Sequence, residues 1–160
     1  MHYWIDGYNL LFHLPKTEDS FEEKRRILIF KINEQIKKFS LTATVVFDAS
    51  DPSQNFDTRS HYDSLEIIYT HPKKSADDAI LEAIELSKNP SLLCVVSSDK
   101  GLCLKAKALG SNTLSLPEFL HFLSKKHKRK TSNVHMEYQD SPQEIARLLK
   151  IFSNPSTRKD

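Results

Sequence analysis

Short apolar runs alternate with amphipathic segments along most of the chain. Runs rich in apolar and β-branched residues predict five buried strands, over residues 3–6, 42–47, 64–70, 91–97 and 111–116. Apolar residues at intervals of three and four predict helices over residues 21–39, from 75 onward, over 100–109 and over 117–126. Because strands alternate with helices and are apolar at most positions, the pattern predicts an α/β fold with a mainly parallel sheet covered on both faces.

Capping signals mark the starts of several of these helices. Ser20 with Glu23, and Ser75 with Asp78, have the three-residue spacing of a capping box. A further spacing of this kind near the end of the chain precedes apolar residues at helical intervals. It predicts a final amphipathic helix over residues 142–152.

The composition narrows the class of protein. Of 160 residues, 39% are hydrophobic and 28% are charged, which suits one domain with a substantial core. No apolar stretch approaches the roughly 20 residues that span a bilayer. We expect no signal peptide, because the first strand pattern begins almost at residue 1 and no basic segment stands before it. Cys94 and Cys103 lie in apolar or helical patterns, and no Cys/His cluster of the zinc-binding kind occurs. We therefore expect a cytoplasmic protein without a membrane segment.

Aspartates occur where several predicted strands end. Asp6 ends the first strand, Asp48 ends the second, and Asp99 follows the fourth. Because ligands of parallel sheets bind beyond the carboxyl ends of the strands, we expect these carboxylates to lie at one edge. Asp77, in the first turn of the helix after Ser75, would join them if that helix begins at the same edge. Converging carboxylates repel one another unless a divalent cation compensates, and oxygen ligands favour Mg²⁺ or Mn²⁺.

Each of these acids except Asp6 also has an explanation that does not involve a metal ion. Asp77 and Asp78 suit a helix N-terminus, and we assign Asp78 to the capping box. Asp99 could cap the helix that follows it, and Asp48 could begin the next turn. No such explanation covers Asp6, because the residues after it do not have the pattern of a helix start.

A basic run contrasts with the balanced charge of the whole chain. The formal net charge is +2, yet residues 125–130 contain five cationic side chains, which are Lys125, Lys126, Lys128, Arg129 and Lys130. Such a run can contact nucleic-acid phosphates, or it can be a solvated helix C-terminus, where cations are also favoured. We favour phosphate contact, because the acids require an anionic substrate to be brought to them.

Several segments resemble the successive motifs of the YacP-like NYN domains, which belong to the PIN-like nuclease superfamily. The resemblance is carried, in order, by IDGYNLLF, VVFDAS, SLEIIYTHPKKSADDAI and CVVSSD, and it runs from residue 3 to about residue 130. It implies a three-layer α/β/α fold whose five predicted strands are ordered 3-2-1-4-5. The domain would span residues 1–130, and residues 131–160 would form a C-terminal extension similar to that of this subgroup.

The resemblance also implies a site and an activity. Asp6, Asp77 and Asp99 match the family's catalytic acids, and Asp48 matches a further position, so that these side chains would hold Mg²⁺ or Mn²⁺. The implied activity is metal-dependent endoribonuclease cleavage, with RNA as the partner. Whether mRNA presented by a ribosome is that RNA stays open. Gly101 stands where many PIN relatives have another acid, which leaves open whether one or two metal ions bind.

Candidate substrate-positioning residues lie beside these acids. Asn9 matches the asparagine of the DGYN motif, and we expect it to orient Asp6 or the substrate. Tyr8 and Ser98 are further candidates for substrate positioning. Tyr8 and Phe12 could also stack on a base, although Phe12 suits the core at least as well.

Two other functions fit parts of the pattern. A non-cleaving RNA-binding module of the same fold is consistent with the small number of candidate acidic ligands. A metal-dependent cleavage assay separates such a module from a nuclease. Acidic pockets also occur in aspartyl-phosphate phosphohydrolases and phosphate-receiver domains. The former normally have a second acid two residues after the first, where this chain has Tyr8, and the fifth strand lacks the lysine of the latter. We therefore favour the nuclease.

Overall fold

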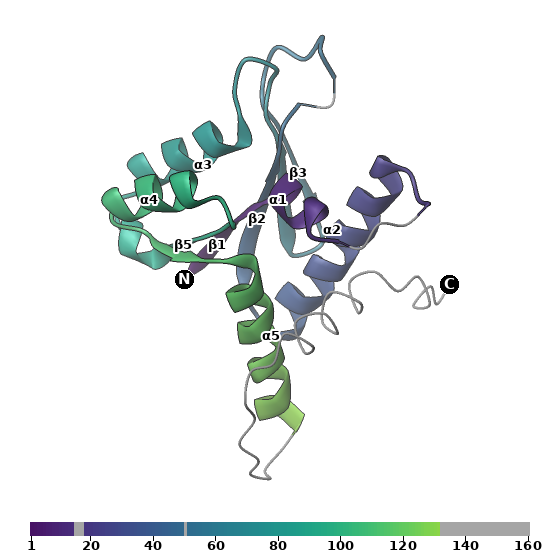
Figure 1. The fold of residues 1–160 in the computed structure, drawn as a ribbon, viewed down its shortest axis with the longest axis vertical. Helices are drawn as coiled ribbons and strands as arrows, with labels where there is room; N and C mark the ends of the chain where they lie inside the picture. Colours follow the sequence, from purple (N-terminus) through teal and green to yellow (C-terminus); the bar gives the residue numbers. More distant parts are fainter. Residues whose placement is uncertain (15–17, 50, 132–160) are drawn as a thin grey trace.

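The computed structural model describes residues 1–14, 18–49 and 51–131, which form a three-layer α/β/α fold (Figure 1). Its strands are β1 (His2–Asp6), β2 (Thr42–Phe47), β3 (Thr58–Tyr62), β4 (Leu65–Tyr69), β5 (Leu93–Val96) and β6 (Asn112–Leu114). Its helices are α1 (Gly7–Phe12), α2 (Phe21–Lys38), α3 (Ala76–Glu85), α4 (Lys100–Ala108) and α5 (Leu116–Thr131), with a short 3₁₀ helix, η1, at Pro90–Leu92. The predicted α/β class is confirmed.

The strands form one sheet in the order β3-β4-β2-β1-β5-β6. The strands β4, β2, β1, β5 and β6 are parallel to one another and correspond to the predicted order 3-2-1-4-5, which is confirmed. Ile5 of β1 lies between Val45 of β2 and Val96 of β5. The three central strands therefore end at nearly the same level, which is where Asp6 lies.

The edge strand β3 is an addition to the five predicted strands. It pairs antiparallel with β4, and all five of its residues are exposed, so no apolar run marks it in the sequence. In the turn to β4, Asp63 has a φ of 54°, and the side-chain oxygen of Asn33 in α2 accepts the backbone N–H of Ser64. Backbone pairing with β4 and this contact from α2, rather than burial of its own side chains, hold β3 in place.

A short helix, α1, begins directly after β1. Asp6 is its N-cap, and Asp6 Oδ1 accepts the backbone N–H of Asn9 at 3.1 Å. Gly7 lets this turn lie against β2, because a Cβ at position 7 would lie 2.4 Å from the ring of Phe47. The expectation that no helix starts after Asp6 was therefore wrong, since a capping contact and a close tertiary approach support one.

Two apolar clusters cover the two faces of the sheet. On one face, side chains of α2 and α5 pack with Ile5 and Val45 of the central strands. On the other face, α3 and α4 pack on Val46 and Val95. Figure 1 shows these two pairs of helices on opposite sides of the sheet. Because α1, α3 and α4 each follow a parallel strand, their N-termini all lie at the carboxyl edge of the sheet.

The predicted helices within the domain correspond to α2, α3, α4 and α5. The Ser75–Asp78 capping box is formed, and the side chain of Ser20 accepts the backbone N–H of Glu23. The helix predicted over residues 142–152 lies outside the described residues. Within residues 1–14, 18–49 and 51–131, no helix combines the length and apolar character that crossing a membrane requires.

Candidate active site

Four aspartates from separate parts of the chain line one crevice at the carboxyl edge of the sheet. Asp6 ends β1, Asp48 follows β2, Asp77 lies in the first turn of α3, and Asp99 is the N-cap of α4. The crevice has a volume of about 290 Å³. The structure thus brings these carboxylates together, because α3 begins at the same edge as the ends of β1 and β2.

Backbone N–H groups at helix N-termini hold three of the four carboxylates. In each case Oδ1 accepts the bond, from Asn9 of α1 to Asp6 at 3.1 Å, from Ala76 of α3 to Asp48 at 2.7 Å, and from Leu102 of α4 to Asp99 at 2.9 Å. The partial positive charges of these helix N-termini offset part of the repulsion among the acids. Asp99 therefore has the capping role that its sequence position allowed, and it lines the crevice as well.

Ser97 links two of the acids and was missed by the sequence analysis. Its side chain is 1% exposed. Its hydroxyl donates to Asp6 Oδ2 at 3.2 Å and accepts the backbone N–H of Asp99 at 3.1 Å. A polar residue directly after a buried strand was the available signal, but two serines stand there and Ser98 was the one selected.

The candidate positioning residues Asn9 and Ser98 contact each other. The side-chain oxygen of Asn9 accepts the backbone N–H of Ser98 at 2.8 Å, which ties α1 to the loop after β5. Asn9 contacts Asp6 through its backbone N–H and not through its amide side chain. Tyr8 lines the crevice, and its ring stacks on Phe21 with centroids 5.3 Å apart.

Asp77 differs from the other three acids in its electrostatics. Among the described residues, its carboxylate accepts no hydrogen bond, and burial together with the charges of Asp6, Asp99 and Asp48 raises its pKa to about 6. Burial also raises the pKa of Asp6. The next residue, Asp78, behaves in the opposite way, because hydrogen bonds from the side chain and backbone of Ser75 lower its pKa.

The donor set of the crevice fits a hard divalent cation. All four acids offer carboxylate oxygens, and no cysteine or histidine of the described residues lines the crevice. Among the described residues, neither carboxylate oxygen of Asp77 accepts a hydrogen bond. Asp48 and Asp99 each keep one carboxylate oxygen, Oδ2, without a hydrogen bond from these residues. Over the same residues, no three His, Cys, Asp or Glu side chains are already close enough together to hold a metal ion. The carboxylates therefore line a common crevice without forming a closed ligand cage.

The sequence and the fold can be placed among known proteins. The family model of the YacP-like NYN domain matches residues 3–154. The chain belongs to the YacP-like NYN family. This family has a nuclease-like fold that is associated with RNA. It is part of the PIN-like nuclease superfamily, whose members typically use divalent metal ions.

Solved structures of Rae1 (YacP) from Bacillus subtilis are similar to this NYN domain. A point mutant of that protein gives a TM-score of 0.64 at 23% identity, covering 92% of this chain and 91% of that chain. A second structure of it gives a TM-score of 0.63 at 22% identity, covering 96% of this chain and 82% of that chain. At these identities the likeness supports the fold alone. No curated protein sequence matches this chain.

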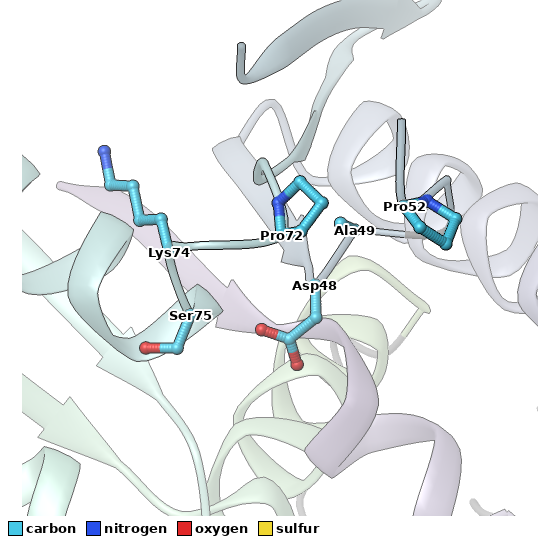
Figure 2. Close-up of a pocket in the computed structure, with 6 residues that line it drawn as sticks. All are labelled: Asp48, Ala49, Pro52, Pro72, Lys74 and Ser75. Carbon is cyan, nitrogen blue, oxygen red and sulfur yellow. The ribbon is translucent and has the colours of Figure 1, made fainter. Parts of the chain in front are cut away.

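The acidic crevice of the NYN domain adjoins a second pocket (Figure 2). This pocket has a volume of about 370 Å³ and is lined by Asp48, Ala49, Pro52, Pro72, Lys74 and Ser75. Asp48 and Ser75 line both spaces. Figure 2 shows the ammonium of Lys74 directed away from the carboxylate of Asp48. The second pocket is therefore less charged than the crevice, with two proline rings in its wall.

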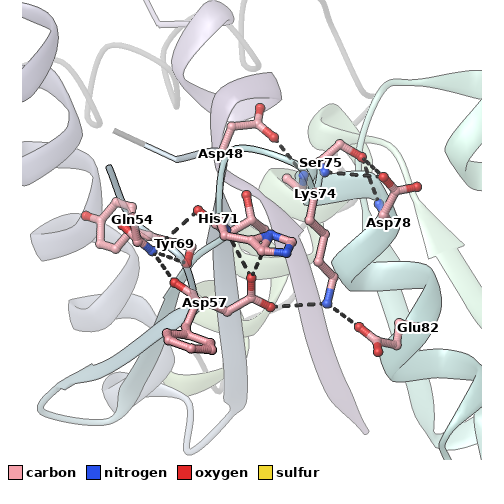
Figure 3. A network of polar contacts seen from close by, with 12 residues as sticks. Asp48, Gln54, Asp57, Tyr69, His71, Lys74, Ser75, Asp78 and Glu82 are labelled. Atoms are coloured by element: carbon pink, nitrogen blue, oxygen red, sulfur yellow. Dashed lines mark hydrogen bonds and ion pairs between the residues drawn. The ribbon is translucent and has the colours of Figure 1, made fainter. Parts of the chain in front are cut away.

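Ion pairs hold the loop that leads into α3 (Figure 3). Asp57 accepts the backbone N–H of His71 at 3.0 Å and a hydrogen bond from Lys74 Nζ at 3.1 Å, and Lys74 also pairs with Glu82. The Lys74 ammonium is thus engaged with two carboxylates outside the crevice. By holding this loop, the network positions the start of α3 and with it Asp77.

The basic run lies on α5, away from the acids. The Lys126 ammonium is 5.1 Å from the centroid of the Phe122 ring, which in turn packs against Tyr3 near the amino end of β1. Asp6 is at the opposite end of the same strand. The structure therefore does not bring the first residues of the basic run, Lys125 and Lys126, to the crevice.

Proposed function

We propose that this NYN domain is a metal-dependent endoribonuclease that hydrolyses RNA phosphodiester bonds at the acidic crevice. The observation that carries the proposal is the convergence of four aspartates, one of which, Asp77, has no hydrogen bond to its carboxylate among the described residues. Such a group is available to a cation. Membership of a nuclease-like family supports the same conclusion.

The four aspartates are the proposed ligands of Mg²⁺ or Mn²⁺, with Asp6, Asp77 and Asp99 as the catalytic set. When bound, the cation supplies an activated water near neutral pH and offsets charge on the phosphate in the transition state. The chain itself orients the ligands, because helix N-termini and the Ser97 hydroxyl hold the carboxylates in place. This pre-organisation lowers the cost of arranging the carboxylates around the cation.

The basic run on α5 is proposed to contact RNA phosphates outside the crevice. Its residues are Lys125, Lys126, Lys128, Arg129 and Lys130. Because α5 extends away from the carboxyl edge of the sheet (Figure 1), these contacts would bind a distant part of the RNA and not the scissile phosphate. The run would therefore contribute affinity, whereas the crevice would select the bond that is cut.

A non-cleaving RNA-binding module of the same fold is the second candidate. The observation that favours it is the open arrangement of the acids, with Gly101 at the position where many PIN relatives have a further acid. A Cβ at position 101 would lie 3.1 Å from Asp99 Oδ1, so an added acid would crowd the carboxylate already there.

A cleavage assay on the full chain separates the two candidates. Single-stranded and structured RNA are incubated with Mn²⁺, with Mg²⁺, or with chelator. We expect metal-dependent cleavage that Asp6→Asn and Asp77→Asn each reduce at least about 100-fold, since each removes a ligand charge while keeping the side-chain shape. The matched control is Asp78→Asn, which changes the adjacent acid in the capping box and should retain most activity.

Each result of this assay has a direct interpretation. RNA binding without cleavage under any metal condition would support the non-cleaving module instead. Equal losses of activity for Asp77→Asn and Asp78→Asn would show that both substitutions act by disturbing helix α3, and not by removing a metal ligand at position 77.

A further inference from the structure

The side chain of Phe12 is exposed at the rim of the acidic crevice. Phe12 ends α1 and is 80% exposed, whereas the preceding residues Leu10 and Leu11 are 3% and 6% exposed. It lines the crevice together with the four aspartates. The expectation that Phe12 suits the core is therefore not met, and its exposed ring lies beside the acids.

Another aromatic side chain at the crevice, Tyr8, is already engaged. Its ring stacks on Phe21 at an interplanar angle of 18° and contacts the ring of Phe47 edge-on at 5.8 Å. Phe12 has no ring partner among the described residues. Of the described aromatic residues that line the crevice, Phe12 is the one whose ring faces no other described ring.

The position of Phe12 relative to Asp6 is well defined. Both residues belong to one helical unit, because Asp6 caps α1 at one end and Phe12 closes it at the other. A helix rises about 1.5 Å per residue, so the two positions are about 9 Å apart along the axis. The Nδ1 atom of His13 lies 2.7 Å from the Asn9 carbonyl oxygen, and Gly7 lies closely against Phe47, which together restrain both ends of α1.

The surroundings of the ring restrict what can bind there. The carboxylates repel an anionic group from the same place unless a cation accompanies it, so the group that meets the ring is not itself an anion, and stacking favours a flat group with apolar faces. A nucleobase attached to the sugar next to the scissile phosphate has these properties. Base stacking on an aromatic side chain tolerates any base, because every base has a π face.

We propose that Phe12 is a substrate-positioning residue that stacks on an unpaired nucleobase beside the phosphate held at the acids, and thereby selects single-stranded RNA. The inference rests on the proposed function, because it takes RNA as the ligand of the crevice. In a duplex, both faces of an internal base are covered by its neighbours. Only an unpaired base can present a face to Phe12 while its phosphate reaches the crevice.

Binding is measured without cleavage, so that the test does not depend on activity. All proteins are full chains with Asp77→Asn, which is expected to suppress cleavage, and the buffer contains Ca²⁺, so that a cation accompanies the phosphate at the remaining carboxylates. The probes are a short unpaired RNA with a single 2-aminopurine and the same sequence in a fully paired duplex. The variants are Phe12→Ala, Phe12→Trp and the control Phe56→Ala, whose side chain is also 80% exposed but lines neither pocket.

We expect Phe12→Ala to weaken binding of the unpaired RNA about 5- to 150-fold, the range for loss of one base–aromatic stack, and to abolish quenching of the 2-aminopurine. Phe12→Trp should retain both signals, and Phe56→Ala should change neither. Duplex binding should be the same for all variants. Equal effects of Phe12→Ala and Phe56→Ala, equal weakening for duplex and unpaired RNA, or no binding of the unpaired RNA would each overturn the proposal.

A second measurement separates this inference from the proposed function. In the protein with Asp77 intact and Mn²⁺ present, Phe12→Ala should raise KM for unpaired RNA by a similar factor. Cleavage with an unchanged KM would refute the role of Phe12 and leave the nuclease assignment standing. A Phe12-dependent signal in the binding assay without any cleavage would support the stacking site and refute the nuclease.

Discussion

Replacing Asp77 by Asn should stabilise the metal-free protein at neutral pH. The pKa of Asp77 is raised from 3.8 to about 6, chiefly by burial and then by the charges of Asp6, Asp99 and Asp48. At about 1.4 kcal/mol per pKa unit, this corresponds to at most about 3 kcal/mol of cost for the ionised form. Because the side chain is partly exposed, screening reduces the cost to on the order of 1–2 kcal/mol.

The helix N-terminus acts in the opposite direction. Asn at position 77 loses a favourable charge–dipole contact in the first turn of α3, worth about 0.3–1 kcal/mol. We therefore expect a net gain of about 1 kcal/mol at pH 7 in chelator, which for a chain of this size is a rise in Tm of roughly 2–4 °C. Thermal unfolding followed by circular dichroism measures it.

The gain should depend on pH with a predictable sign. Since the folded-state pKa of Asp77 is above its unfolded value, the native state binds the proton more tightly, and the cost of ionisation is fully present above about pH 6. It is relieved as the pH falls toward 4. The stability difference between Asp77→Asn and the unaltered chain should therefore shrink over that interval, while the effects of carboxyl groups outside the crevice cancel in the comparison.

Asp78→Asn is the matched control, and we expect its effect on stability to have the opposite sign. The pKa of Asp78 is lowered by hydrogen bonds from Ser75, so its contribution to stability is present above its unfolded pKa and is lost as the pH falls through the folded one. We expect this variant to be less stable than the unaltered chain at pH 7. An Asp77→Asn protein that melts lower in chelator, with a deficit constant from pH 7 to 4, would refute the idea that the acids repel in one crevice.

Three further predictions concern the supports of the site and the basic run. Ser97→Ala leaves Asp6 Oδ2 and a backbone N–H without partners, so urea denaturation should show a loss of about 1–3 kcal/mol; an unchanged midpoint would mean that water replaces the hydroxyl. Gly7→Ala places a methyl group 2.4 Å from the Phe47 ring and should cost about 1–3 kcal/mol in the same assay, unless α1 shifts without penalty. Replacing three cations of the run 125–130 by Gln should reduce the salt slope of single-stranded RNA binding by roughly 0.7 per lost contact, whereas an equal slope would identify the run as solvated surface.

Local sequence patterns determined most of the architecture. The apolar runs of β1, β2 and β5 and the helical spacing of α2 are visible without tertiary information, because burial acts on each segment separately. The parallel order then placed Asp6, Asp48 and Asp99 at a common edge. The strand β3 could not be recognised in this way, since its five residues are all exposed and no apolar run marks it. It is held by backbone pairing with β4 and by an ion pair between Arg59 and Glu66.

The tertiary structure decided how the acids are held and which neighbours they have. The start of α1 depends on a glycine that lies against Phe47 from β2, and the hydrogen bond from Ser97 to Asp6 joins residues 91 positions apart. Periodicity within one segment contains no information about such contacts. The same holds for Phe12, whose apolar character suited the core in sequence but whose position at the end of a short helix exposes it beside the crevice. Burial pattern is a local property that the sequence carries, whereas the convergence of side chains from distant segments exists only once the sheet and its helices have packed.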